Sequence, residues 1–291
     1  MRTIGLLFDP HVADGADPHI APGAHDGTGV VNAAIDKLQE VGVDWTVVGG
    51  DLRHLISPIH GDTDWGGWHG ETNNEYYHQD WALAKELFEE RLEEYYPIRG
   101  NLDRPLSLYR EYFPAEEYPL WYWFEDDGAR YVFLDTNPHE GYHTLTEAQN
   151  FVSAPQLSML ERLMDEDPEV PTFVFAHAPL AKHHDVIDDD LGTGHAGVYF
   201  YTLNYLSVQR VLERGNTVFV NSGHVYDDFG RGSRNVNGVE YVLARHLVKN
   251  KNPEYGGDVR WMTVDPDART AAVHYYDVGA DEEGTISRTS W

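Results

Sequence analysis

Short apolar runs that end in a polar residue dominate the organisation of this chain. One such run covers residues 45–48, and two glycines separate it from Asp51. A run of this length predicts a buried strand, and glycine lets the backbone turn sharply or approach a ligand closely. We therefore expect this strand to deliver a carboxylate to the edge of a sheet, where it can hold one cation or bridge two.

The beginning of the chain also has an apolar run that ends in polar residues, and a predicted helix connects it to the run at residues 45–48. Residues 3–8 predict a first buried strand that leads to Asp9 and His11, and two side chains one residue apart point the same way on an extended segment. Residues 29–42 have apolar positions at helical spacing. A strand, a helix and a strand form a βαβ unit, and open α/β sheets build their sites at the carboxyl ends of their strands.

The remainder of the chain continues this alternation. Helices are expected at residues 80–95, 155–165 and 204–213. A hairpin is expected at residues 121–124 and 130–134, buried strands at 172–176 and 217–221, and a terminal β meander with strands near 239–244, 259–264 and 270–276. Residues 55–79 predict a long loop, for which a pocket rim and an ordinary surface loop are equally reasonable interpretations.

The length and the continuity of the chain bound the number of domains. Its 291 residues suffice for one large α/β domain or two small ones. Because the sequence contains no internal repeat, low-complexity tract or linker, we expect a single domain over residues 1–291, with loop insertions at about 54–80 and 182–200.

The charge of the chain is strongly acidic. Lysine and arginine number 21 against 49 aspartates and glutamates, for a formal net charge of −28. These acids are spread along the chain, which suits solubility in concentrated salt and predicts a salt-adapted source; an ordinary acidic protein is the alternative. Nucleic acids and anionic membranes are not expected as partners, because both require a basic surface. The oligomeric state stays open.

The chain has no cysteine, which excludes disulfides, thiolate metal sites and a cysteine nucleophile. Any metal must be held by His, Asp, Asn or Glu, which are ligands of hard or borderline divalent ions. The first residues lack the basic and apolar regions of a signal peptide, and no run reaches the length of a membrane span. A cytoplasmic location is therefore expected.

Five predicted strand ends, including that of a short apolar run at residues 96–98, each carry a metal-ligand type of side chain. They present Asp9 with His11, Asp51, Asn101, His177 and His224. Their order resembles the calcineurin-like metallophosphoesterase superfamily over about residues 3 to 226. The matching motifs are D-x-H, G-D, G-N, a histidine after an apolar strand, and G-H. The segment 134–136 and the helix with Gln156 also resemble that family. The resemblance implies an α/β fold, a four-layer α/β/β/α sandwich of two mixed sheets flanked by helices.

The resemblance also implies a role for each ligand. Asp51 would bridge two divalent ions such as Mn²⁺, Fe²⁺ or Zn²⁺. The first ion would be held by Asp9 and His11, and the second by Asn101, His177 and His224. Two ions about 3.5–4 Å apart would clamp a phosphate and generate a hydroxide for in-line attack. Asp51, Asn101 and His177 form the implied catalytic set.

Two positions depart from the family pattern. The histidine that normally follows the motif asparagine is Leu102, which cannot protonate a leaving group, a contribution worth about 10²–10⁴-fold in rate; active phosphodiesterases of the superfamily carry GNCD here, and GNLD resembles that version. The final histidine of G-H-x-H is Tyr226, a poor ligand while neutral. We hypothesise that His54, Tyr226 or both complete the first site; the alternative is a weak or empty first site.

Several basic side chains are candidates for contacts with the substrate. They are Arg53, Arg99, His184 and His195. Each has a plainer interpretation, because arginines pair with carboxylates in so acidic a chain and histidines in polar loops are commonly exposed. Two further histidines on predicted strands, His246 and His274, are interpreted as structural.

These features predict a metal-dependent phosphoesterase that hydrolyses a phosphomonoester or phosphodiester of a small molecule by metal-activated hydroxide. Because Leu102 supplies no proton, a diester or a substrate with a good leaving group is favoured. The alternative is a degenerate member, weakly active or non-catalytic, that uses the same metal-binding surface as a binding or scaffold protein. A nuclease is a poorer interpretation, because the chain lacks a basic groove.

Overall fold

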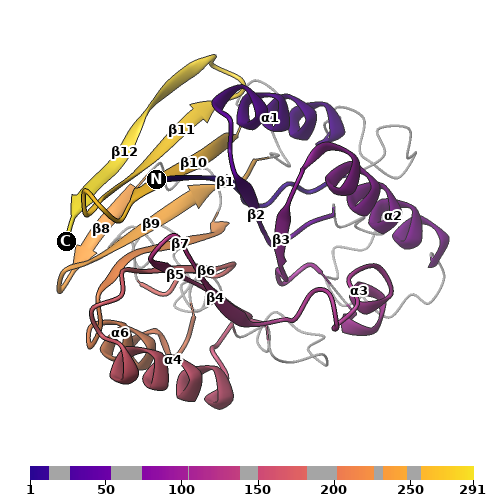
Figure 1. Ribbon diagram of the computed structural model, residues 1–291. Coiled ribbons are helices and arrows are strands. Elements are labelled where there is room, and N and C mark those ends of the chain that lie inside the picture. The colour runs from indigo at the N-terminus through magenta and orange to yellow at the C-terminus, as the bar shows by residue number, and fades with distance from the viewer. Residues whose placement is uncertain are drawn as a thin grey trace, which may run out of the picture.

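The computed structural model describes residues 1–12, 27–53, 74–103, 105–137, 150–181, 202–225, 232–247 and 257–291. Two six-stranded sheets pack face to face, and helices cover their outer faces (Figure 1). This arrangement confirms the predicted four-layer sandwich. In the described part of the chain, no helix combines the length and the apolarity that a membrane span requires.

The first sheet has the strand order β12-β11-β10-β1-β2-β3. Its strands are β1 (Arg2–Leu7), β2 (Trp45–Gly49), β3 (Tyr95–Ile98), β10 (Asp258–Asp265), β11 (Thr270–Asp277) and β12 (Glu282–Ser290). β1, β2 and β3 are parallel, whereas β10, β11 and β12 form an antiparallel meander beside β1. The carboxyl ends of β1, β2 and β3 therefore meet at one edge.

The second sheet has the strand order β4-β5-β6-β7-β9-β8. Its strands are β4 (Tyr122–Asp126), β5 (Ala129–Leu134), β6 (Thr172–Ala176), β7 (Thr217–Val225), β8 (Gly232–Val236) and β9 (Val239–Arg245). β5, β6, β7 and β9 are parallel, and β4 and β8 pair antiparallel at the two edges. This sheet also presents its parallel carboxyl ends together.

Helices cover the outer faces because their apolar stripes fit the sheets. The helices are α1 (Gly27–Val41), α2 (Asn74–Arg91) and α3 (Leu106–Tyr112) on the first sheet and α4 (Ala154–Glu166) and α6 (Tyr205–Leu212) on the second (Figure 1). Val31, Ile35 and Leu38 of α1, spaced four and three residues apart, are fully buried.

The core between the two sheets is rich in aromatic side chains. Trp45 of β2 packs edge-on against Tyr131 of β5, with ring centroids 5.0 Å apart. Phe133 stacks on Phe175 of the neighbouring strand β6 at 5.2 Å. Such pairs contribute about 0.5–1.5 kcal/mol beyond the burial of their area. This core holds the two sheets, and hence their carboxyl edges, in a fixed relation.

Some predicted boundaries and connections are wrong. The helix expected at residues 80–95 starts at Asn74 and ends at Arg91. Residues 74–80, which were expected to belong to the first loop insertion, are therefore helical. The rest of that insertion, residues 54–73, and the second insertion, residues 182–200, lie outside the described residues. The strand expected near 239–244 is not part of the meander, because β9 pairs parallel with β7 in the second sheet. α3, β8 and β12 were not predicted, since their sequences lack a clear apolar period.

Candidate metal centre

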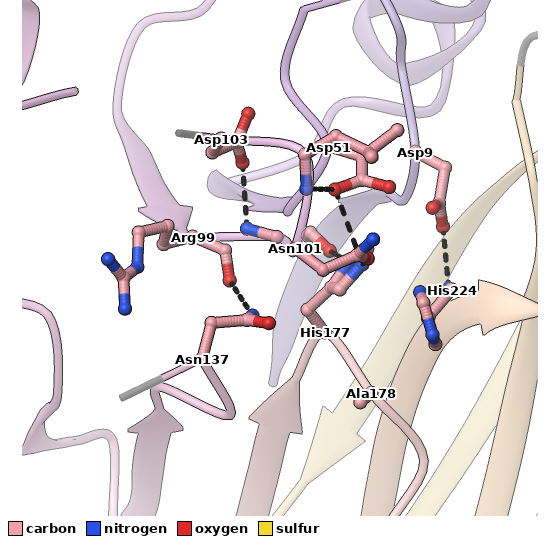
Figure 2. Close-up of polar contacts among 12 residues, drawn as sticks. Asp9, Asp51, Arg99, Asn101, Asp103, Asn137, His177, Ala178 and His224 are labelled. Atoms are coloured by element: carbon pink, nitrogen blue, oxygen red, sulfur yellow. Dashed lines mark hydrogen bonds and ion pairs between the residues drawn. The ribbon is translucent and has the colours of Figure 1, made fainter. Parts of the chain in front are cut away.

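Ligand-type side chains meet at the carboxyl edges of the two sheets (Figure 2). Asp9 and His11 follow β1, Asp51 follows β2, and His224 lies near the end of β7. The backbone at these four residues has positive φ, with values of 51°, 41°, 50° and 69°. Residues other than glycine rarely adopt this conformation, which costs on the order of 1–3 kcal/mol and clusters at functional sites. Tight turns thus direct polar side chains into one place.

One cluster contains Asp51, His177 and His224, whose ligand atoms all lie within 4.8 Å of one another. The Nε2 atom of His177 lies 2.9 Å from Oδ1 of Asn101 and 3.5 Å from Oδ1 of Asp51. Two atoms that bind one ion at about 2.0–2.2 Å, about 90–110° apart, are about 2.8–3.6 Å from each other. Both distances fit a shared cation, and Figure 2 shows these side chains directed toward one another.

The protonation of His177 determines what this cluster can bind. Its Nδ1 atom lies 2.9 Å from the carbonyl oxygen of Gly49, and a carbonyl only accepts, so Nδ1 carries the proton. Burial lowers the pKa of His177 to about 4, so the ring is neutral at pH 7 and Nε2 presents a lone pair. Oxygen atoms of Asn101 and Asp51 face that lone pair. The donor set therefore suits a divalent cation.

Two glycines let the backbone approach these ligands. A Cβ atom on Gly100 would lie 2.1 Å from both N and Oδ1 of Asp51. A Cβ atom on Gly50, where φ is 90°, would lie 2.4 Å from Nδ1 of His177. No side chain fits at either position, which is the physical reason for the G-D and G-N motifs.

Asp103, the last residue of the GNLD motif, joins the two loops that carry Asp51 and Asn101. Its carboxylate accepts hydrogen bonds from the backbone N–H groups of Leu52, at 2.9 Å, and Gly100, at 2.7 Å. Burial and the neighbouring charge of Asp51 raise the pKa of Asp103 above its usual range. Both of its oxygens accept from the backbone, so Asp103 positions the loops.

A second cluster contains Asp9, His11 and His246, whose ligand atoms also lie within 4.8 Å of one another. All three are buried, with exposed fractions of 0%, 1% and 5%. The Nε2 atom of His246 lies 3.3 Å from Oδ1 of Asp9. The other oxygen of Asp9 accepts a hydrogen bond of 2.9 Å from the backbone N–H of His224 (Figure 2). Asp9 thus connects this cluster to the first.

Comparisons with known proteins identify the fold. No family model and no curated protein matches the sequence. Among solved structures, PhoD is similar with a TM-score of 0.56 and 10% identity, over 99% of this chain and 72% of PhoD. A protein described as a 5′-nucleotidase from Staphylococcus aureus, in complex with alpha-ketoglutarate, is similar with a TM-score of 0.51 and 12% identity, over 98% of this chain and 53% of that one.

The chain has the calcineurin-like metallophosphoesterase fold. The motif resemblance is thereby confirmed at the level of the fold. The two candidate clusters lie at the strand ends from which the motifs were read, and they bring together six predicted ligands, namely Asp9, His11, Asp51, Asn101, His177 and His224.

The calcineurin-like fold of this chain brings one further histidine, His246, to the site. His246 was interpreted as structural, but it lies among the ligand atoms of Asp9 and His11. The signal that could have found it is its position directly after the apolar strand β9, which matches the position of His177 after β6. His274, by contrast, lies within β11 and its ring stacks on Trp261 at 5.4 Å.

Asn150 is a second residue that sequence reasoning missed. Its side-chain Nδ2 atom lies 3.4 Å from Nε2 of His224, and Asn150 is 3% exposed. No sequence signal could have found it, because it precedes helix α4 and follows no predicted strand.

The two arginines predicted to contact substrate lie in buried contacts with the scaffold. Arg99 forms an ion pair of 2.9 Å with Asp135, and both side chains are 3% exposed. Its guanidinium points away from His177 in Figure 2. The guanidinium of Arg53 lies over the ring of Trp81, 5.3 Å from its centroid. These contacts give no support to a substrate role, which stays a prediction.

Four of the predicted site residues lie outside the described residues. They are His54, Tyr226, His184 and His195. Their predicted roles as ligands or substrate contacts therefore stay predictions. Leu102, at the position where the family has its histidine, is described, and its backbone N–H donates a hydrogen bond of 2.8 Å to Oδ1 of Asp51.

Proposed function

We propose that this chain is a metal-dependent phosphoesterase that hydrolyses the phosphate ester of a small molecule. The observation that carries the proposal is the convergence of Asp51 Oδ1 and Asn101 Oδ1 on the unprotonated Nε2 of His177. These electron-pair donors belong to one anionic and two neutral groups, and a divalent cation stabilises such an arrangement. The calcineurin-like fold supports the choice of phosphate chemistry.

Each part of the site has a task in this proposal. When bound, two divalent ions supply positive charge to the phosphate oxygens and lower the pKa of an attacking water molecule. Asp51 contributes the negative charge that keeps both ions in place. The hydrogen bond from His177 Nδ1 to the Gly49 carbonyl keeps Nε2 directed into the cluster. Because the chain has a net charge of −28, the ions also supply the charge that attracts an anionic substrate.

The substrate class follows from Leu102, which has no proton to give a leaving group. The proposal therefore favours phosphodiesters and esters with a good leaving group over alkyl monoesters, since loss of a general acid costs about 10²–10⁴-fold. Nucleic acid is disfavoured by the acidic charge of the chain.

A metal-binding protein without catalytic activity is the second candidate. The residues that favour it are Leu102 and Tyr226, which stand where the family has histidines. The two candidates share the metal centre and differ only in turnover, so that one set of assays separates them.

The test uses purified protein loaded with Mn²⁺ and two substrates, p-nitrophenyl phosphate and its bis ester. We expect turnover of the bis ester to exceed that of the monoester. Asp51→Asn should lower turnover by more than about 100-fold, since even loss of an outer-shell partner costs about 10–100-fold.

The matched control is Asp165→Asn, which changes an exposed carboxylate in an ion pair with Arg214 and should leave turnover unchanged. Turnover that survives in Asp51→Asn contradicts the proposed site. Bound metal without turnover of either substrate supports the metal-binding protein.

A further inference from the structure

His246 lies at the edge of the second sheet where β7, the strand that carries the G-H motif, also ends. Arg245, the last residue of β9, pairs with Val225, the last residue of β7. His246 follows directly after Arg245, at the end of the strand next to the one that carries the G-H motif. A histidine is therefore available at this edge of the sheet from the adjacent strand.

The backbone around His246 is fixed against the strand that carries Asp9. The N–H of Leu247 donates a hydrogen bond of 3.1 Å to the carbonyl oxygen of Phe8. On the other side, a Cβ atom on Gly257 would lie 2.0 Å from the carbonyl oxygen of His246, so the chain passes closely there. These contacts place the imidazole beside Asp9 and His11 with little backbone freedom.

The side-chain geometry fits a shared ion. His246 Nε2 and Asp9 Oδ1 are 3.3 Å apart, within the separation of about 2.8–3.6 Å expected for two ligands of one divalent ion. The rings of His246 and His11 have their centroids 5.3 Å apart. All three residues are buried, with at most 5% of their surface exposed.

We propose that His246 is a ligand of the first metal ion, in the role that Tyr226 and His54 were expected to fill. This inference rests on the proposed metal centre but not on its catalytic activity. Asp9, His11 and His246 would then hold the first ion, and Asp51, His177 and His224 belong to the neighbouring cluster. The first site is therefore supplied by both sheets, through β1 and β9.

Metal content and affinity of the full chain test this assignment. After removal of metal with a chelator and titration with Mn²⁺, we expect two ions per wild-type chain, and one ion per chain in His246→Gln at the same concentrations. The affinity of the first site should fall by more than about 100-fold, beyond the range for outer-shell partners. The electron paramagnetic resonance signal of a coupled Mn²⁺ pair should disappear with it.

Three variants serve as controls. His274→Gln removes another half-buried histidine of the C-terminal strands and should retain two ions. Tyr226→Phe and His54→Gln should also retain both. Two ions with unchanged affinity in His246→Gln overturn the inference, as does loss of an ion in Tyr226→Phe or His54→Gln while His246→Gln keeps both.

A metal-loaded crystal structure of the wild type decides the question if His246→Gln does not fold. With Zn²⁺, the distance from the ion to Nε2 of His246 should be about 2.0–2.1 Å; an ion in this cluster that His246 does not contact overturns the inference. Two bound ions with no phosphoesterase turnover would leave the assignment of His246 intact and remove only the catalytic proposal.

Discussion

At the scale of single residues, burial keeps His177 of the candidate metal centre neutral, since its pKa falls from 6.5 to about 4. Between these pH values the unfolded chain binds a proton on His177 and the folded chain does not, so stability falls as the pH is lowered from 6.5 to about 4 and changes no further below.

This linkage predicts the pH dependence of the metal-free protein. Relative to His177→Gln, wild type should lose about 3 kcal/mol of unfolding free energy between pH 7 and pH 4, as an upper bound from the pKa shift. Urea denaturation of both proteins in chelator measures the difference. The raised pKa of Asp103 changes stability with pH in the opposite direction. Asp103 is present in both proteins, so its contribution cancels to first order in the difference between them. A pH-independent difference between the two proteins would contradict the prediction.

Asn150 is predicted to position His224 for metal binding. Ligating histidines commonly have their second ring nitrogen held by an outer-shell partner, and loss of such a partner costs about 10–100-fold in metal affinity. We expect Asn150→Ala to weaken Mn²⁺ binding by this factor in a calorimetric titration. Asn235→Ala, in the exposed strand β8, is the control and should bind as wild type does. Equal affinities in the two variants would argue against a positioning role.

At the scale of elements, contacts between the turns that follow the strands hold the loops of the candidate metal centre in place. Arg99 after β3 and Asp135 after β5 join the two sheets through a buried ion pair. Gln156 of α4 extends this connection, because its side chain both accepts from and donates to the backbone of Asp135. The family-like segments 134–136 and 156–161 therefore brace the loop that carries Asn101.

The turn at Gly100, whose backbone lies against Asp51, gives a prediction about glycine. Gly100→Ala places a methyl group 2.1 Å from Asp51, and such overpacking typically costs about 1–3 kcal/mol. We expect this loss of unfolding free energy together with loss of the ion held by Asp51, His177 and His224. Gly232→Ala is the matched control, since a Cβ atom there meets nothing within 4 Å and its effect should stay within about 0.5 kcal/mol. Denaturation and metal titration of both variants measure this; a Gly100→Ala protein that keeps full affinity would refute the close approach.

At the scale of the whole molecule, net charge opposes compactness. With a formal charge of −28, like charges about 10 Å apart repel by about 0.4 kcal/mol per pair in water before screening. Raising NaCl from about 0.1 M to 1 M shortens the Debye length from about 10 Å to about 3 Å. We expect the free energy of unfolding to rise by on the order of 1–3 kcal/mol over this range, as measured by thermal or urea denaturation.

Sucrose provides the control for that measurement, because it favours compact states by exclusion from the surface and does not screen charge. Stability that rises with sucrose but stays constant with NaCl would show that charge repulsion is not what limits this fold. The same outcome would remove the argument for a salt-adapted source.

The sequence by itself determined the features that are local. Each buried strand could be read from an apolar run, and each ligand of the G-D, G-N and G-H motifs from the residues that follow such a run, because a strand and its turn depend on neighbours in sequence. The order of those motifs carried the resemblance to a known family, and that resemblance implied the sandwich of two sheets.

Only the tertiary structure decided which strands are neighbours and what their turns face. β9 leaves the expected meander and pairs with β7, and this pairing brings His246 to Asp9, 237 positions away in the chain of 291 residues. The packing of the first sheet on the second likewise brings Arg99, after β3, into a buried ion pair with Asp135, after β5. The partner of a side chain across two sheets depends on packing between segments distant in sequence, which no local pattern records.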